Sequence, residues 1–259
     1  MKCIYSLFLR WKHVFVSRLY QKRINDGTVS EQEEIYDDSF YRKFSTQQKI
    51  ENSHIIFPII EEYIPIKRVI DVGCGVGAWS KYFCDKNVYV KGYDFDWVPE
   101  QYMAVPKDGY FVSCDLNERL VASEKFDLVI NLEVAEHLKP ERAETLIEDL
   151  AKLGDVVLFS AAIPYQGGDG HLNEQFPEYW GKLFAQNNMS PIDIIRPKIW
   201  RNENIAQTWV KQNLILFVRN ELVDKFPKEF HADPNCLTRL FFLRFLKIRK
   251  RIKSWRLIL

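Results

Sequence analysis

The chain has 259 residues, of which 47% are hydrophobic, 14% aromatic and 27% charged. This composition excludes extended disorder and provides enough apolar side chains for one α/β domain with terminal extensions. No apolar run reaches the roughly 18 residues of a membrane-spanning helix. Five scattered cysteines without a CxxC pair argue against a zinc knuckle or a disulfide framework, which favours a reducing, cytoplasmic location.

Charge is distributed unevenly along the chain, although the net charge is only +1. Residues 1–24 contain six basic and no acidic side chains, and residues 238–259 contain eight basic and no acidic ones. The segment between them therefore holds 22 of the 36 basic side chains and all 35 acidic ones. An acidic body makes nucleic acid an unfavourable partner, because phosphates need cationic side chains.

Both cationic ends mix apolar and basic residues in a way that predicts amphipathic helices. Such helices either pack on the domain or contact an anionic membrane at its inner face, and the sequence leaves both options open. We therefore divide the chain into a basic helix and linker (1–44), a central domain (45–219) and a basic helical tail (220–259).

The central domain is predicted to open with a helix over Ser45–Tyr63, where Ser45 and Gln48 resemble a capping box. Short apolar strands then alternate with helices. Strands are predicted at Arg68–Val72, Val88–Tyr93, Tyr110–Ser113, Phe126–Leu132, Asp155–Ala161, Ile192–Arg196 and Asn213–Val218, and helices from Ala78, over Pro140–Lys152 and over Pro177–Asn187. Repeated βα units of this length predict a mostly parallel, doubly wound sheet that binds ligands at the carboxyl ends of its strands.

The segment V-I-D-V-G-C-G-V-G-A-W-S (69–80) runs from a strand through a glycine turn into a helix. Gly73 and Gly75 permit positive φ and close approach of the backbone to a ligand. The spacing to Ala78 also fits the dinucleotide fingerprint. Asp71, however, would repel a pyrophosphate, whereas it suits an ammonium group.

Two further acidic residues follow the next two strands. Asp94 ends the second strand in G-Y-D, where a carboxylate can accept both hydroxyls of a ribose. Asp115 follows the third strand in C-D-L-N, where it can accept from an exocyclic adenine amine while Leu116 packs on the ring. These positions predict a site for an adenosyl cofactor.

These motifs, together with F-D-L-V-I-N-L-E-V-A-E-H-L (126–138) and D-V-V-L-F-S-A-A-I-P (155–164), resemble the class I S-adenosylmethionine-dependent methyltransferases over roughly residues 45–219. The resemblance implies a seven-stranded sheet whose last strand is antiparallel, with S-adenosylmethionine as the cofactor. Carried over position by position, it implies cofactor contacts at Asp71, Gly73, Gly75, Asp94, Asp115, Leu116 and Asn131. A nicotinamide-dependent oxidoreductase is the alternative from another class, which Asp71 and C-D-L-N disfavour.

Two stretches are expected to meet at the carboxyl ends of the fourth and fifth strands. They contain Glu133, Glu136 and His137, and His171 with Glu174. The string E-x-x-E-H is similar to that of magnesium-dependent O-methyltransferases acting on quinone precursors or RNA 3′ ends, which implies Mg²⁺ or Mn²⁺ on Glu133, Glu136, His137 and His171. Related strings also occur in methyltransferases without a metal. In that version His171 or His137 is the general base, near Glu174.

The string G-H-L-N-E-Q-F-P-E-Y-W (170–180) resembles a bacterial subgroup associated with surface polysaccharides. We therefore predict O-methylation of a sugar hydroxyl on a surface glycan or its precursor. Tyr179 and Trp180 either stack on a sugar or belong to the core. A metal-assisted enzyme acting on RNA or on a quinone-type small molecule is the alternative.

Overall fold

The computed structural model describes residues 46–237, except for residues 97, 122–123, 165 and 169. The predicted basic helices at residues 1–24 and 238–259 lie outside the described residues, as do Ser45 and the predicted linker. Within the described part of the chain, no helix is long and apolar enough to cross a bilayer.

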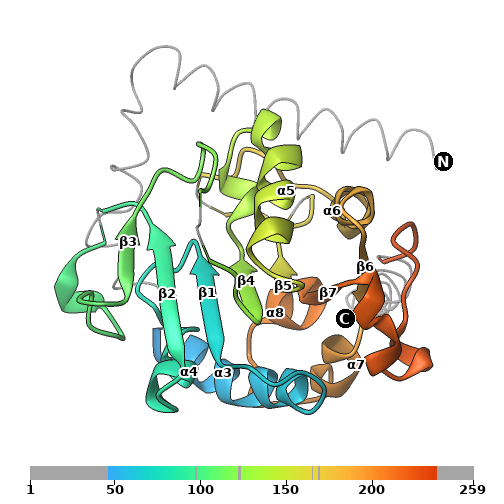
Figure 1. The fold of residues 1–259 in the computed structure, drawn as a ribbon, viewed down its shortest axis with the longest axis horizontal. Helices are drawn as coiled ribbons and strands as arrows, with labels where there is room; N and C mark the ends of the chain where they lie inside the picture. Colours follow the sequence, from blue (N-terminus) through green and yellow to red (C-terminus); the bar gives the residue numbers. More distant parts are fainter. Residues whose placement is uncertain (1–45, 97, 122–123, 165, 169, 238–259) are drawn as a thin grey trace, which may run out of the picture.

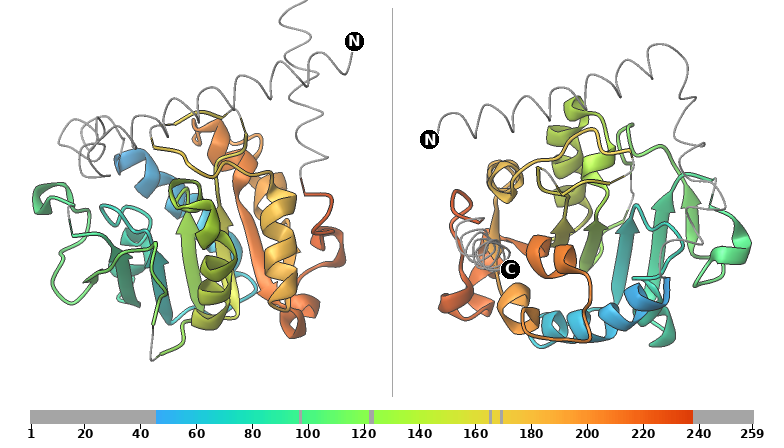
Figure 2. Two further views of the ribbon diagram at one scale, coloured as in Figure 1. Left: turned by 90° about the horizontal axis from the view of Figure 1, so that it is seen from above. Right: turned by 180° about the vertical axis from the view of Figure 1, so that it is seen from behind.

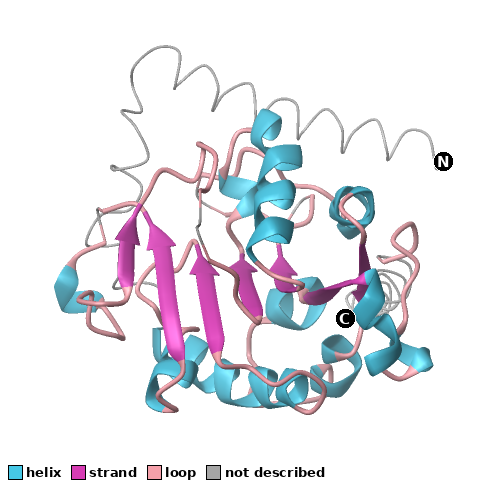
Figure 3. Cartoon of the chain, viewed as in Figure 1, coloured by secondary structure: helices cyan, strands magenta, loops and turns pink. Residues whose placement is uncertain are grey.

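The described residues form one seven-stranded sheet in the order β3-β2-β1-β4-β5-β7-β6. Its strands are β1 (Arg68–Val72), β2 (Tyr89–Asp94), β3 (Phe111–Ser113), β4 (Leu128–Leu132), β5 (Val156–Ser160), β6 (Met189–Ile192) and β7 (Ile215–Arg219). Neighbouring strands from β3 to β5 pair in parallel, whereas β7 is antiparallel to both β5 and β6. The carboxyl ends of β1 to β5 therefore share one edge of the sheet (Figure 1 and Figure 3). The predicted fold, including its antiparallel last strand, is confirmed.

Helices cover both faces of this sheet (Figure 2). The α-helices are α3 (Thr46–Glu61), α4 (Lys81–Asp85), α5 (Ala143–Leu153), α6 (Pro177–Gln186), α7 (Ile195–Ile199) and α8 (Thr208–Asn213). Short 3-10 helices span Glu100–Tyr102, Ala135–His137, Pro140–Arg142, Asn220–Lys225 and Lys228–Phe230. Helices α5 and α6 pack together on one face, and α3 contacts α4 and α7 on the other.

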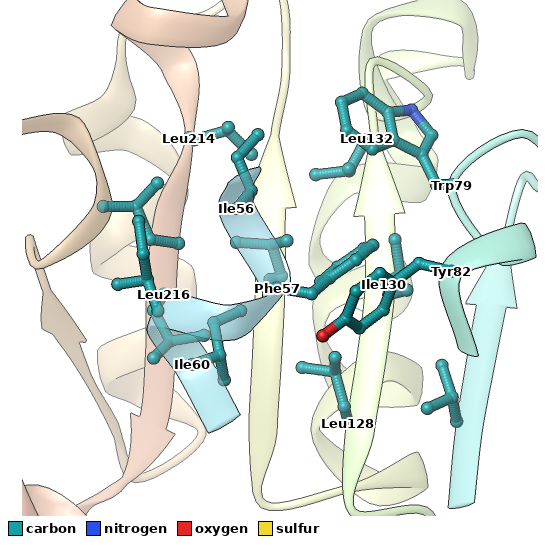
Figure 4. Close-up of a cluster of buried hydrophobic side chains, with 14 of the residues drawn as sticks. Ile56, Phe57, Ile60, Trp79, Tyr82, Leu128, Ile130, Leu132, Leu214 and Leu216 are labelled. Atoms are coloured by element: carbon teal, nitrogen blue, oxygen red, sulfur yellow. The ribbon is translucent and has the colours of Figure 1, made fainter. Parts of the chain in front are cut away.

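Helix α3 covers the middle of its face of the sheet. Its side chains Ile56, Phe57 and Ile60 are fully buried. They belong to the same hydrophobic cluster as Leu128 and Ile130 of β4 (Figure 4). Because neighbouring strand residues point to opposite faces, Val129 belongs to the cluster on the α5 side. This packing sets the position of α3 against the sheet, and therefore of the side chains in its first turn.

The prediction of a strand over Ile192–Arg196 was wrong in its position. Strand β6 ends at Ile192, and the chain turns into α7 at Ile195. A short apolar run with Ile at 192, 194 and 195 fits a strand and a buried helix equally well. The structure selects the helix because Arg196 is buried there and forms a bidentate ion pair with Asp193, at 2.7 Å for both nitrogens. Helix α8 was not predicted.

The segment 220–237, which we had placed in the basic tail, packs on the domain. Phe226 and Leu237 are 3% and 2% exposed. The amide of Asp193 donates to the carbonyl of Phe230, and the amide of Ala232 donates to that of Pro191. These backbone hydrogen bonds attach the segment to the sheet beside β6.

Candidate active site

A cleft lies at the carboxyl ends of β1 to β4. Its described lining residues come from the glycine turn after β1, from the loops after β2, β3 and β4, and from α3 and α8. They are Lys49, Gly73, Cys74, Gly75, Val76, Ala78, Trp79, Asp94, Phe95, Val98, Asp115, Leu116, Asn117, Leu132, Glu133, Val134, His137, Leu138 and Trp209.

The glycine turn is fixed by its neighbours as much as by its own conformation. Gly73 has φ +82°, and a Cβ at this position would lie 2.3 Å from a methyl group of Val134. Its amide donates to the carbonyl of Tyr93 at 2.7 Å. The amide of Gly75 donates to Oδ2 of Asp94 at 2.6 Å. The floor of the cleft therefore requires glycine at position 73, and Asp94 joins the turn to the end of β2.

Five of the seven predicted cofactor residues line the cleft: Gly73, Gly75, Asp94, Asp115 and Leu116. Asp71 and Asn131 do not appear in its lining. Asp71 is 1% exposed and accepts a hydrogen bond from Ser80 Oγ at 2.7 Å. Asn131 is fully buried, and its Nδ2 donates to the carbonyl of Val72 at 2.8 Å. Both side chains hold the strand ends beneath the cleft.

Burial of acidic groups dominates the electrostatics of this region. Burial raises the pKa of Asp71 to about 7 and also raises the pKa of Asp94. Burial lowers the pKa of Lys49, while the charges of Glu133, Asp71 and Asp94 oppose that shift. Among the described lining residues Lys49 is the one lysine or arginine. A cleft with several carboxylates and one ammonium suits a ligand that is mainly cationic and carries one anionic group.

Sequence reasoning missed Lys49 and Trp209. Lys49 lies in the first turn of α3, about 20 residues before the glycine turn, where it looks like an ordinary surface lysine. Trp209 lies on α8, which was not predicted. Hydrogen bonds from Gln48 to the carbonyl of Asn204 and from Asn52 to Gln207 connect α3 to the segment before α8. Only tertiary packing brings these two side chains to the cleft.

Acid and base side chains meet beside the cleft, as the sequence predicted for this pair of loops. Potential ligand atoms of Glu136, His137 and His171 all lie within 4.8 Å of one another. The rings of His137 and His171 are nearly perpendicular, with centroids 4.8 Å apart. His171 Nδ1 is 2.9 Å from Oε1 of Glu174. The carbonyl of Glu136 accepts the amides of residues 172 and 173, which fixes the loop that carries His171.

Glu136 and Glu133 differ sharply in their surroundings. Glu136 is fully buried, and neither of its carboxylate oxygens has a hydrogen-bond partner among the described residues. Burial, reinforced by the charge of Glu133, raises its pKa well above the ordinary value. Glu133 instead accepts from Gln166 Nε2 at 3.0 Å and from Asn213 Nδ2 at 3.2 Å. Three of the four predicted metal ligands thus come together, whereas Glu133 is held by amides.

The two aromatic residues of the 170–180 string take different places. Trp180 is 2% exposed, and its ring lies 5.3 Å from that of Phe159 in the core. Tyr179 is partly buried and packs against the hydrophobic cluster that contains Trp180 and Phe159. The structure therefore favours a core role over sugar stacking for Trp180.

The cleft, its carboxylates and the strand order can now be compared with known proteins. A family model described as a methyltransferase domain matches residues 40–214, about two thirds of the chain. The chain belongs to this methyltransferase family. The chain is therefore a methyltransferase, and S-adenosylmethionine-dependent methyltransferases share its fold. The match decides against the nicotinamide-dependent alternative.

Solved structures share the fold at low sequence identity. Magnesium protoporphyrin IX methyltransferase from Synechocystis PCC 6803 with bound SAH is 21% identical, over 67% of this chain and 83% of that one, with a TM-score of 0.49. A SAM-dependent methyltransferase from Archaeoglobus fulgidus is 14% identical, over 73% and 99%, with a TM-score of 0.50. An amino pentose methyltransferase from Micromonospora echinaspora is 13% identical, over 74% and 98%, with a TM-score of 0.47. A search of curated proteins found no match.

Asp71→Asn is expected to change how the stability of the methyltransferase depends on pH. The folded protein keeps a proton on Asp71 up to a pKa of about 7, whereas the unfolded chain loses it near 3.8. The stability due to this proton is therefore lost as pH rises from about 4 through 7. Between pH 5 and pH 8 the variant should gain roughly 2–3 kcal/mol relative to the wild type, at about 1.4 kcal/mol per pKa unit.

Urea denaturation of both proteins at pH 5 and pH 8 measures this difference. Asp96→Asn is the matched control, because the side chain of Asp96 is 72% exposed. Parallel pH profiles for the wild type and Asp71→Asn would contradict the assignment of a buried, protonated Asp71.

Proposed function

We propose that this methyltransferase O-methylates a sugar hydroxyl on a surface glycan or its precursor. The observation that carries the proposal is the meeting of Glu136, His137, His171 and Glu174 next to the cleft. A hydroxyl is a poor nucleophile until a base or a metal ion assists removal of its proton. Transfer to an acceptor that is already nucleophilic would need no such cluster.

In this proposal S-adenosylmethionine occupies the cleft along the ends of β1 to β4. The carboxylate of Asp94 accepts hydrogen bonds from the ribose hydroxyls, and that of Asp115 accepts one from the exocyclic amine of adenine. Asp115 uses Oδ1 to accept from the backbone and side chain of Asn117, at 2.8 and 3.1 Å, which holds its carboxylate in place. At the other end, the ammonium of Lys49 pairs with the carboxylate of the donor's amino-acid tail.

Lys49→Met is expected to weaken binding of S-adenosylhomocysteine by about 10- to 100-fold, the range for loss of one charge-assisted hydrogen bond. Methionine keeps the apolar part of the side chain and removes only the charge. Binding of 5′-methylthioadenosine, which lacks the amino-acid tail, should stay unchanged. Calorimetric titration of both ligands measures the two affinities.

Gln47→Ala is the control for this experiment, since Gln47 lies in the same helical turn but is exposed and bonds to Glu51. An equal loss of affinity for both ligands in Lys49→Met would place Lys49 elsewhere in the site. No binding of either ligand to the wild-type protein would contradict the proposed donor site altogether.

The reaction is a displacement at the methyl carbon. The bond from sulfur to the methyl group breaks and a bond from the acceptor oxygen forms, so the sulfonium becomes a neutral thioether. The acceptor proton passes to His171. Glu174 accepts from Nδ1 of this imidazole and stabilises the imidazolium that forms, and His137, whose ring centroid is 4.8 Å from that of His171, extends the pair to the cleft lining. The side chains of His171 and Glu174 are both only 11% exposed, so little water competes for the same proton.

A sugar is the acceptor that best matches the remaining side chains. Trp209 is half-buried in the cleft lining and offers an apolar ring face. The loop before α6 adds amide side chains, of which Gln175 donates to Asn173 at 2.9 Å. The negative charge of the central chain disfavours an RNA acceptor.

Loss of the gene is expected to remove one methyl group from a surface glycan of the source cell. Mass spectrometry of the glycans with and without the gene tests this directly. Complementation with His171→Ala should restore little methylation, because loss of a general base typically lowers the rate by 10²- to 10⁴-fold. Complementation with His54→Ala should restore it fully, since His54 is exposed on α3.

Two results would contradict this assignment. Glycans that are identical in both strains would remove the proposed acceptor. Full restoration by His171→Ala, with failure of His137→Ala, would assign the base to His137, which itself lines the cleft.

A metal-assisted version is the second candidate, and the buried carboxylate of Glu136 favours it. Two oxygens without a hydrogen-bond partner beside two imidazoles fit a divalent cation such as Mg²⁺ or Mn²⁺. Glu136, His137 and His171 would hold it, and Glu174 would orient His171 from behind. A bound cation would acidify the acceptor hydroxyl. The same chemistry serves a quinone-type diol or an RNA end.

Calorimetric titration with Mn²⁺ separates the two versions. The metal-assisted version predicts binding to the wild-type protein that is lost in Glu136→Gln, together with loss of methylation after chelation. The base version predicts no Mn²⁺ binding and activity unchanged by chelators. Glu133→Gln is the control, because amides already occupy its carboxylate and it should leave Mn²⁺ affinity nearly unchanged.

A further inference from the structure

Arg142 and Asp149 form an ion pair beneath the loop that follows β3. Their side chains are 4% and 1% exposed, and the distance from Arg142 Nη2 to Asp149 Oδ2 is 2.7 Å. Arg142 begins the turn that leads into α5, and Asp149 lies two turns later on the same helix. Neither residue lines the cleft.

This ion pair contacts the backbone of the loop at two points. Arg142 Nε donates to the carbonyl of Leu116 at 2.9 Å. Asp149 Oδ2 accepts the amide of Leu120 at 3.0 Å. The stretch from Leu116 to Leu120 is therefore attached to α5 at both ends. We call residues 115–120 the adenosyl loop, because Asp115, Leu116 and Asn117 line the cleft.

Stability alone does not account for such a pair. Removing two charges from water costs several kcal/mol, and well-packed apolar side chains of the same volume are often equally stable or better. An apolar pair, however, could neither donate to the carbonyl of Leu116 nor accept the amide of Leu120. The pair instead supplies directional contacts to backbone groups that lie next to the ligand.

We propose that Arg142 and Asp149 are positioning residues that fix the adenosyl loop for binding of the methyl donor. The proposal rests on the assignment of this loop to the adenosyl half of the donor, which is part of the proposed function. With both charges absent, the carbonyl of Leu116 loses its donor and the loop shifts away from the position that Asp115 requires. The amino-acid end of the cleft, about Lys49, is unaffected.

The test is the double variant Arg142→Met with Asp149→Leu. It removes both charges together, because Asp149→Leu alone would leave the buried guanidinium of Arg142 without its ion-pair partner. Thermal unfolding should show a melting temperature close to that of the wild type. Titration with S-adenosylhomocysteine and with 5′-methylthioadenosine should show affinities reduced by the same factor, on the order of 10- to 100-fold, as for other small misplacements in binding sites.

The double variant Lys81→Met with Asp85→Leu is the matched control. Lys81 and Asp85 form an i,i+4 ion pair at 2.7 Å on α4, their side chains are 34% and 50% exposed, and neither lines the cleft. This variant should bind both ligands within about twofold of the wild type, as expected for an exposed pair.

Three outcomes would overturn the inference. The double variant could bind both ligands like the wild type, or lose affinity for S-adenosylhomocysteine alone, which is the pattern expected of Lys49→Met. Equal losses in the Lys81→Met, Asp85→Leu control would attribute the effect to the general loss of an ion pair. A wild-type protein that binds neither ligand would instead overturn the proposed donor site, and this inference with it.

Discussion

The hydrogen bond from the amide of Gly75 to Asp94 is the contact on which the cleft depends. It joins the turn after β1 to the end of β2, and the carbonyl of Tyr93 accepts from Gly73 and Cys74 at the same junction. Parallel pairing of β1 with β2 and of β2 with β3 then places the loops after all three strands at one edge. The register of these parallel strands therefore places the cleft at this edge of the sheet.

Among the described residues around the cleft of this methyltransferase, buried acidic groups outnumber the cations. Asp71, Asp94 and Glu133 are acidic groups whose pKa values are all raised by burial. In a protein without a ligand these carboxylates cost stability, and Lys49 is the cation that shares their region. In the proposed function, a sulfonium donor would add positive charge beside these carboxylates, which would favour binding of the donor over its neutral product.

A second pair of loops carries the acid and base side chains beside the cleft. The backbone carbonyl of Glu136 fixes the loop between β5 and α6. The carboxylate of Glu136 lies near the two histidines and has no hydrogen-bond partner among the described residues. Left-handed backbone at Glu133, with φ +56°, begins the turn that makes this geometry possible. The two Glu residues of the E-x-x-E-H string therefore differ: Gln166 and Asn213 donate to the carboxylate of the first, whereas the second is the one assigned to chemistry in the proposed function.

The sequence by itself determined the strand ends with their acidic residues, because a strand, a glycine turn and a following carboxylate are local patterns. It also predicted that His137 and His171 would meet, since neighbouring strands end at one edge. It did not determine α7, because the short apolar run around Ile195 fits helix and strand alike, nor α8, which is a six-residue helix without an apolar periodicity. Only the tertiary structure determined the positions of Lys49, Trp209 and the Arg142–Asp149 pair. Each of them contacts residues that are distant in sequence, and the periodicity of the sequence carries no information about such contacts.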